Sequence, residues 1–317
     1  MPHGLKSWCG CRSGPTLGVG LVLLAVLVSG CAAVRNPSHV PDGSLEIYTG
    51  KMRELGARAK PSPSGVLAAT LEGQDPGLKA ALLELRVHPG AARHLRVAER
   101  YRRLKILDAA HDHFERARQL DPTDAAAYEG LARIWRDWGF PNLGLGDASR
   151  AVYYAPSSAT AQNTLGTVLT AMGRGADARR AYERALALDP RAAYALNNLC
   201  YLSFLEGEIA AAVTECWAAL DVDPALAPAR NNLALAYAAD RRDDLSRREF
   251  LAASNVAAGW YNIGIVDLAE KRYAHASSAF AVAQLQRPSW AAAGERARRA
   301  RILALKAGGT SQQPRTD

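Results

Sequence analysis

Apolar residues follow three different patterns along this chain of 317 residues. Leu17 to Val28 form one unbroken apolar run of 12 residues, LGVGLVLLAVLV. Between Cys31 and about Pro76 no apolar period is sustained, and prolines and glycines are frequent. From there to about Lys306, large and small apolar residues recur as they do in packed helices. The pattern predicts an apolar leader, a flexible tether and a long helical region.

Prolines divide the helical region at nearly constant intervals. The gaps between them are 33, 34, 34 and 34 residues, and the prolines are Pro89, Pro122, Pro156, Pro190 and Pro224. Proline ends a helix because its ring cannot continue the hydrogen-bond ladder and because the preceding residue avoids the α conformation. We therefore expect each interval to hold two helices, the second ending just before the proline.

Small and aromatic residues recur at fixed places within each interval. The first helix carries a large residue followed by a small one: Leu165-Gly166, Leu199-Cys200, Leu233-Ala234 and Ile263-Gly264. The second helix carries alanines on either side of a slot that holds Tyr182, Phe250 or Phe280, and Cys216 in the fourth interval. These positions and the 34-residue period resemble the tetratricopeptide repeat (TPR). The resemblance implies an all-α TPR solenoid in which small residues let the paired helices cross closely.

Six repeats fit this pattern, and their ranges are 91–124, 125–158, 159–192, 193–226, 227–256 and 257–290. The fifth is short, with 30 residues and no closing proline. A solenoid needs capped ends, and helices at 76–87 and 291–306 are expected to supply them. The predicted organisation is therefore a leader at 1–30, a tether at 31–75, a solenoid at 76–306 and a disordered tail at 307–317.

The leader has the features of a secretion signal. Lys6 and Arg12 precede the apolar run, which is too short to span a bilayer as a stable anchor. Val28-Ser29-Gly30-Cys31 resembles a bacterial lipobox, which implies a lipoprotein with palmitate and other acyl groups on Cys31. Ala32, in place of Asp, favours the periplasmic face of the outer membrane. The alternatives are an ordinary signal peptide or a short membrane anchor.

The positive charge of the chain is mild and concentrated near its end. The net charge is +8, which falls to +6 when Lys6 and Arg12 are removed with the leader. Much of it comes from one predicted helix, with Arg296, Arg298, Arg299, Arg301 and Lys306. No aromatic residues alternate with them as a nucleic-acid stacking surface requires, so no nucleic-acid partner is expected. We interpret them as a solvated helix face, with contact to acidic lipid or an acidic partner as the less favoured reading.

Residue patterns typical of catalysis or metal binding are scarce. His111 and His113 are two residues apart, which places them on different sides of a helix and prevents chelation of one metal. The sequence has no Gly-rich phosphate loop after a strand and no Gly-x-Ser-x-Gly elbow. Acidic residues are expected on helix exteriors. We therefore expect no enzyme, no cofactor and no metal site.

A candidate peptide-binding groove follows from the repeat positions. In TPR proteins the first helices line the concave face, and the fifth residue of three consecutive repeats here is Asn. An amide offers a peptide backbone both a donor and an acceptor. The residue after each is Asn198, Asn232 or Asn262, and asparagine at that sixth position often supports the fold instead. The predicted contact set is Asn163, Asn197, Asn231, Tyr194, Tyr201, Phe204 and Tyr261.

Two further pairs of residues have competing interpretations. Cys200 and Cys216 lie opposite each other in the fourth repeat, where a disulfide is feasible in an oxidising periplasm. Two buried thiols that never join are the alternative. Trp135 and Trp138 flank the turn of the second repeat, either as an exposed docking knob or, more consistent with aromatic packing, as part of the repeat interface.

The overall pattern is that of a non-catalytic protein–protein interaction scaffold in the cell envelope. The chain resembles the TPR lipoproteins that accompany pilus and secretion machines, particularly that of tight-adherence (Flp) pilus assembly and, less closely, the type IV pilus pilotins. The resemblance implies envelope proteins or peptides as partners and a membrane contact through the lipid anchor. A cell-wall accessory protein that positions murein enzymes is the alternative, and an enzyme hidden in the solenoid is a third hypothesis.

Overall fold

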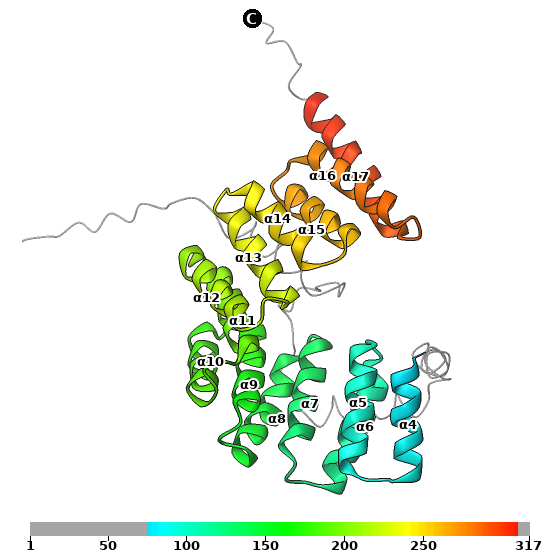
Figure 1. Cartoon of the computed structure of the whole chain (residues 1–317), viewed down its shortest axis with the longest axis vertical. Helices are drawn as coiled ribbons and strands as arrows, with labels where there is room; N and C mark the ends of the chain where they lie inside the picture. Colours follow the sequence, from blue (N-terminus) through cyan, green and yellow to red (C-terminus); the bar gives the residue numbers. More distant parts are fainter. Residues whose placement is uncertain (1–74, 310–317) are drawn as a thin grey trace, which may run out of the picture. The chain divides into compact units, whose positions relative to one another are not determined.

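The computed structural model describes residues 75–309, and every regular element in that range is an α-helix (Figure 1). The predicted all-α fold is confirmed. The leader, the lipobox with Cys31 and nearly all of the tether lie outside the described residues, as does the tail beyond Gly309. Among the helices of residues 75–309, none combines the length and the apolar character that crossing a bilayer requires.

The chain divides between Arg241 and Arg242 into two compact units. The boundary lies inside the predicted fifth repeat, the short one. The described part of the N-terminal unit contains α4 (Pro76–Val87), α5 (Ala91–Arg103), α6 (Leu107–Leu120), α7 (Ala125–Asp137), α8 (Pro141–Tyr154), α9 (Ala159–Ala171), α10 (Gly175–Leu188), α11 (Ala193–Glu206), α12 (Ile209–Val222) and α13 (Ala227–Ala239). The C-terminal unit contains α14 (Asp243–Ala253), α15 (Val256–Ala269), α16 (Tyr273–Gln286) and α17 (Ala291–Gly309).

The second helices end where the prolines predict. Helix α6 ends at Leu120, and the following Asp121 has the extended backbone (φ −138°, ψ 94°) that the next residue, Pro122, favours. The Asp121 carboxylate then accepts the backbone N–H of Thr123 at 3.0 Å, which closes a tight turn. The same carboxylate-to-backbone bond recurs after α10 and α12, at Asp189 and Asp223. Proline and the preceding aspartate together stop each of these helices.

The first and second helices of each repeat are linked through one residue in the left-handed conformation. The residue has φ between 61° and 86°, and it is Lys105, Gly139, Gly173, Gly207, Arg241 or Lys271. After most of them the backbone N–H of the next residue bonds back to the carbonyl five positions earlier, for example Phe140 N to Trp135 O at 2.9 Å. This is the Schellman ending of a helix, in which glycine is favoured because it has no Cβ. The repeat pattern alone does not reveal this position, since lysine or arginine occupies it in three repeats.

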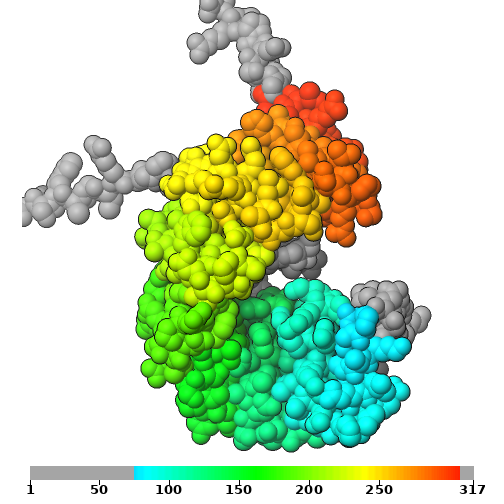
Figure 2. Space-filling view, viewed as in Figure 1, coloured from blue at the N-terminus to red at the C-terminus, as the bar shows by residue number. Residues whose placement is uncertain are grey.

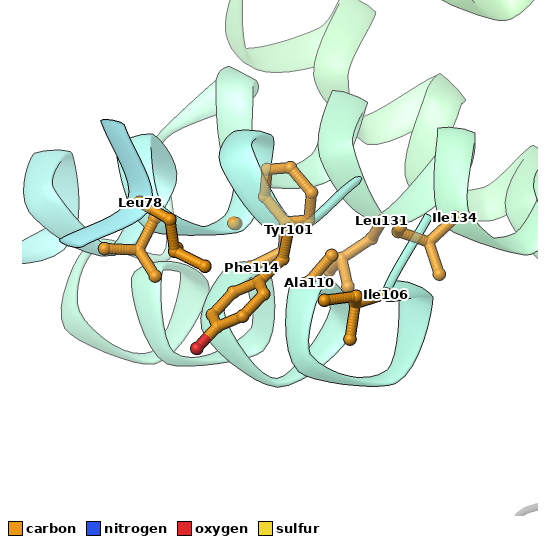
Figure 3. Close-up of a cluster of buried hydrophobic side chains, with 9 residues drawn as sticks. Leu78, Tyr101, Ile106, Ala110, Phe114, Leu131 and Ile134 are labelled. Carbon is orange, nitrogen blue, oxygen red and sulfur yellow. The ribbon is translucent and has the colours of Figure 1, made fainter. Parts of the chain in front are cut away.

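The terminal helices act as the predicted caps. Leu78 of α4 is fully buried against Tyr101, Phe114 and other residues of the first two repeats (Figure 3). At the other end, α17 buries Ala293 and Ala300 and packs against α16. This helix runs to Gly309, so residues 307–309, predicted to belong to the tail, are helical.

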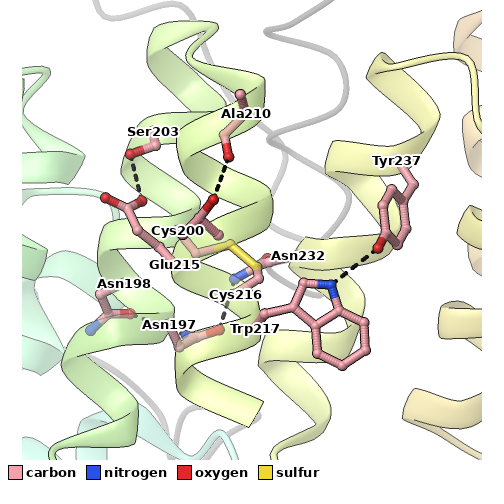
Figure 4. The surroundings of a disulfide bond; sticks show 11 residues. Asn197, Asn198, Cys200, Ser203, Ala210, Glu215, Cys216, Trp217, Asn232 and Tyr237 are labelled. Atoms are coloured by element: carbon pink, nitrogen blue, oxygen red, sulfur yellow. Dashed lines mark hydrogen bonds between the residues drawn. A yellow bond between two sulfur atoms is a disulfide. The ribbon is translucent and has the colours of Figure 1, made fainter. Parts of the chain in front are cut away.

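The aromatic slot of the repeats is filled as predicted. The Tyr182 ring is 1% exposed and lies so close to Gly166 that a Cβ there would collide with it. In the fourth repeat Cys200 and Cys216 occupy the corresponding two positions, both fully buried. They form a disulfide between α11 and α12, with Cα atoms 5.1 Å apart (Figure 4). A covalent bond thus replaces the contact between a ring and a small residue.

The expectation that acidic residues lie on helix exteriors is wrong for Glu129, Glu249 and Asp267, which are 7%, 4% and 5% exposed. In the C-terminal unit the Arg272 guanidinium lies 2.7 Å from carboxylate oxygens of both Asp267 and Asp243. A buried carboxylate is tolerated there because a cation and its hydrogen bonds compensate the lost hydration. Through Arg272, the buried Asp267 of α15 is linked to Asp243 of α14.

Candidate binding surface on the inner helices

The first helices of the N-terminal unit form a continuous row. Helices α5, α7, α9, α11 and α13 each pack against the next member of the row as well as against second helices. Within the N-terminal unit each repeat contacts its neighbours in the chain, and Figure 2 shows these repeats as successive colours from cyan to green. In a stack of helix pairs, the row whose members approach one another lies on the inside of the curve. We call the surface of this row the inner surface.

Asparagines connect neighbouring members of the row. Asn198 on α11 donates its Nδ2 to Oδ1 of Asn163 on α9 at 2.7 Å. Asn232 on α13 likewise donates to Oδ1 of Asn197 on α11 at 2.9 Å (Figure 4). In both cases the sixth-position amide of one repeat bonds to the fifth-position amide of the repeat before it. We call these four residues the amide ladder.

The ladder changes what the fifth-position asparagines offer to a ligand. The carbonyl oxygens of Asn163 and Asn197 accept hydrogen bonds from the next repeat, so the expected role of these two amides as both donor and acceptor needs correction. Asn163 Nδ2 donates no hydrogen bond to any described residue, and Asn197 Nδ2 makes only a long contact of 3.4 Å to Asn198. The sixth-position residues Asn198 and Asn232 have the structural role named as the alternative. What Asn163 and Asn197 present to a ligand is mainly N–H donors.

Charged residues take the place of amides nearer the N-terminus of the row. Arg102 on α5 bonds to the Glu99 carboxylate at 2.8 Å and lies 3.7 Å from that of Asp137 on α7. Arg136 in turn binds Asp137 at 2.7 Å and the Thr167 hydroxyl on α9 at 2.9 Å. We call Glu99, Arg102, Glu129, Arg133, Arg136 and Asp137 the charged section.

Glu129 links the charged section to α9. Its carboxylate accepts hydrogen bonds from the hydroxyls of Thr160 at 3.1 Å and Thr164 at 3.4 Å. Glu129 and Thr164 occupy the fifth and sixth positions of consecutive repeats, as Asn163 and Asn198 do. The sequence does not show this rung, because the 35-residue stagger that it shares with Asn163 and Asn198 becomes known only from the structure.

Comparison with known proteins agrees with this architecture. Residues 159–192, the predicted third repeat, match the family model of the tetratricopeptide repeat. No curated protein sequence matches the chain. The fold is a TPR solenoid.

Solved structures share this fold at low sequence identity. A chain of the APC/C hetero-tetramer Cut9–Hcn1 is 19% identical over 80% of this chain, with a TM-score of 0.58. This chain spans 52% of that one. PilW, described as a widely conserved type IV pilus biogenesis factor, is 21% identical over 63% of this chain and 94% of its own, with a TM-score of 0.52. A TPR protein of Parabacteroides merdae is 13% identical, with coverages of 80% and 98% and a TM-score of 0.54.

The aromatic residues predicted to contact a ligand in the TPR groove differ in burial and in the unit to which they belong. Tyr194 and Tyr201 are half-buried on α11, seven residues apart and so on nearly the same side of the helix. Phe204 is only 1% exposed, and its assignment as a groove contact is wrong. Its side chain points about 80° away from that of Tyr194, because ten residues do not complete whole turns. Tyr261 lies in the C-terminal unit, where its ring stacks on Trp290 with centroids 4.4 Å apart.

The protonation of the inner surface follows from burial and neighbouring charges. Burial raises the pKa of Tyr194, with help from the Asp189 and Glu129 carboxylates, and burial raises that of Tyr201. Both hydroxyls therefore stay protonated at neutral pH and can donate. Burial also raises the pKa of Glu129, and Arg133 and the two threonine hydroxyls offset only part of that effect. Burial acts to raise the pKa of Glu99, but the hydrogen bond and the charge of Arg102 outweigh this effect. The pKa of Glu99 is therefore lower than its ordinary value.

The tryptophans and histidines flagged in the sequence pack within the solenoid. Trp135 and Trp138 meet edge to face with ring centroids 5.2 Å apart, and the His111 ring lies 5.2 Å from that of Trp138. These contacts match packing in the repeat interface. His113 lies against His94, with Nδ1 atoms 3.0 Å apart. Within residues 75–309, no three His, Cys, Asp or Glu side chains are grouped to hold a metal ion.

Proposed function

We propose that this protein is a non-catalytic scaffold of the bacterial envelope that binds an extended segment of another envelope protein on its inner surface. Lipid on Cys31 holds it at the periplasmic face of a membrane, the outer membrane being favoured. The bound protein belongs to a pilus or secretion machine, whose assembly the scaffold assists.

The observation that carries the binding role is the orientation of the amide ladder. Hydrogen bonds from Asn198 and Asn232 of the next repeats fix the amides of Asn163 and Asn197 by their oxygens. The N–H groups of these amides are then held ready for an acceptor, without the entropy loss of ordering a free side chain. The regularly spaced carbonyl oxygens of an extended peptide match such a row of donors. Tyr194 and Tyr201 add half-buried rings for its side chains.

The charged section supports a scaffold better than an active site. General acid–base catalysis needs a titratable group left available to the substrate. Here Arg102 engages both Glu99 and Asp137, and Glu129 accepts hydrogen bonds from two threonines. These groups are engaged with one another or with threonine hydroxyls of the neighbouring repeat. TPR folds typically act as non-catalytic interaction scaffolds, which agrees with this assignment.

The envelope location rests on the sequence. Val28-Ser29-Gly30-Cys31 follows an apolar run of 12 residues, which is the arrangement of a lipoprotein signal. The shared fold with PilW, a type IV pilus biogenesis factor, fits a role in pilus assembly without fixing the machine.

A photo-crosslinking experiment in cells tests the binding role. A photoreactive amino acid replaces Tyr194 on the inner surface or, as a matched control, Arg180, whose side chain is 70% exposed on the second helix α10. We expect the Tyr194 position to crosslink to an envelope protein and the Arg180 position to give no such product. Crosslinking at Arg180 alone would move the binding site to the second helices.

Metabolic labelling tests the anchor separately. Radiolabelled palmitate should enter the wild-type protein and leave Cys31→Ser unlabelled. Equal labelling of the two proteins would refute the anchor while leaving the inner surface untouched, so the two halves of the proposal fail independently.

A further inference from the structure

The last helix of the C-terminal unit exposes apolar and basic residues together. On α17 the exposed fractions of Ile302 and Leu305 are 54% and 70%. Arg298, Arg299 and Arg301 are exposed on the same part of the helix. Because 3.6 residues make one turn, Arg298, Ile302 and Leu305 line up along one stripe, with Arg299 and Arg301 on opposite sides of it. We call these five residues the α17 stripe.

The arginines of the stripe differ from most arginines of the solenoid. Elsewhere arginine is commonly paired on its own helix, as in Arg118 with Glu115 at 2.6 Å and Arg174 with Asp177 at 2.5 Å. Arg298, Arg299 and Arg301 form no ion pair with any described residue, and the only acidic residue of α17 is Glu295, near its start. The stripe is therefore an uncompensated cluster of positive charge around two apolar side chains.

The opposite side of α17 is fixed to the solenoid. Ala293 and Ala300 are fully buried, and the Ser277 hydroxyl of α16 donates to the carbonyl of Ala297 at 3.0 Å. The Arg296 guanidinium lies 5.5 Å from the centre of the Tyr261 ring. The helix is thus packed against α16 on one side, and the apolar residues of the stripe, Ile302 and Leu305, lie outside the buried core cluster.

We propose that the α17 stripe docks on an anionic phospholipid surface. The guanidinium groups bind lipid phosphates, and Ile302 and Leu305 enter the boundary between headgroups and acyl chains. Each basic residue near an anionic bilayer adds attraction, and the apolar pair adds burial that a purely polar polyanion would not provide. This assignment replaces the solvated face expected from the sequence. It shares with the proposed function only the location at a membrane.

The charges argue against two other occupants. A second copy of this chain would bring two positive stripes face to face, and like charges in contact oppose association. A nucleic acid would satisfy the arginines, but it would leave Ile302 and Leu305 without a partner, and the stripe carries no aromatic ring for base stacking.

Vesicle binding of the full chain with Cys31→Ser tests the proposal without any lipid anchor. Vesicles contain phosphatidylcholine alone or phosphatidylcholine with phosphatidylglycerol. The apolar leader can bind both types of vesicle, so the measured quantity is the difference in binding between them. We expect stronger binding to the anionic vesicles and slower amide hydrogen exchange within residues 296–307. Arg298→Gln/Arg299→Gln/Arg301→Gln should reduce the anionic preference at least about tenfold. Ile302→Ser/Leu305→Ser should also weaken binding.

The matched control is Arg86→Gln/Arg184→Gln/Arg191→Gln, which removes the same three charges from exposed positions elsewhere. The control should leave the anionic preference within about twofold, and circular dichroism should show equal helix content in all variants. Equal binding to both vesicle types, or an equal loss in the control, would overturn the proposal. The proposal would also be overturned if the protein bound duplex DNA as strongly as the vesicles and Ile302→Ser/Leu305→Ser left that binding unchanged. Self-association through the stripe would overturn it as well.

Discussion

Two parts of one inner surface join their helices by different chemistry. In the charged section, Arg102 connects α5 to α7 through its ion pair with Asp137, and Arg136 of α7 reaches the Thr167 hydroxyl on α9. In the amide ladder, single hydrogen bonds between uncharged side chains connect α9 to α11 and α11 to α13. The positions correspond, since Glu129 bonds to Thr164 across the same register as Asn163 to Asn198.

The difference indicates that one part of the row contributes mainly to stability and the other mainly to ligand binding. Most charged groups of this section have a partner of opposite charge, because a buried charge without a partner is costly. A side-chain amide has one acceptor oxygen, with two lone pairs, and two N–H donors. When the oxygen binds the next repeat, the N–H donors can still bind a ligand. We therefore assign rigidity chiefly to the charged section and ligand contact chiefly to the amide ladder.

The largest effect is expected from a residue that belongs to neither set. Phe204→Ala removes a ring that is 1% exposed, and it should lower the free energy of unfolding by about 3–5 kcal/mol through loss of burial and formation of a cavity. Urea denaturation followed by circular dichroism measures the change. A loss below about 1 kcal/mol would mean that Phe204 is exposed and available to a ligand after all.

Removal of Arg102 from the charged section should lower the free energy of unfolding more than removal of one hydrogen bond from the amide ladder. Arg102→Met leaves the carboxylates of Glu99 and Asp137 without their shared partner, and it should cost about 2–3 kcal/mol. Asn198→Ala removes one neutral hydrogen bond to Asn163 and should cost about 1 kcal/mol. The same denaturation measurement compares them, and the reverse order would contradict the division drawn above.

Glu129 allows the charged section to be tested by pH. Its pKa in the folded protein is raised above the ordinary 4.5 by burial, so folding favours the protonated form. Its contribution to stability is therefore complete at low pH and is lost as the pH rises through the raised pKa. Glu129→Gln keeps an oxygen for Thr160 and Thr164 but cannot ionise.

Stability of wild type and Glu129→Gln should be compared at pH 4 and pH 7. The free energy of unfolding of Glu129→Gln should rise relative to that of the wild type between pH 4 and pH 7, because only the wild type must then bury a charge. A difference that stays constant, or one that shrinks, would show that Arg133 and the threonines fully compensate the carboxylate.

Much of the fold could be predicted from local sequence signals. Pro122 and Pro190 mark helix ends because proline acts on its own neighbours, and Tyr182 and Gly166 mark a contact within one repeat. The predicted cap at 76–87 coincides with α4. Such features depend on residues close in sequence or on a fixed period, and both can be read without coordinates.

The candidate surface was less predictable because it depends on how repeats are staggered. Bonds from Asn198 to Asn163 and from Thr164 to Glu129 join residues 35 positions apart, and the sequence did not show which amide atom faces inward. The direction of Phe204 could have been found from helical geometry alone. Lys105 has the left-handed backbone conformation that usually indicates glycine. Because the residue is lysine, its type did not predict the turn.

The most direct test of the binding account is Asn163→Asp, which changes one atom of the amide ladder. Aspartate keeps an oxygen to accept the hydrogen bond from Asn198 but has no N–H to offer a ligand. With the envelope protein identified by crosslinking, its affinity for the full-length variant is measured in solution, and Thr214→Asp on α12 controls for the added charge. The account predicts a loss of about tenfold for Asn163→Asp, unchanged thermal unfolding, and no loss for the control. An unchanged affinity for Asn163→Asp would contradict it.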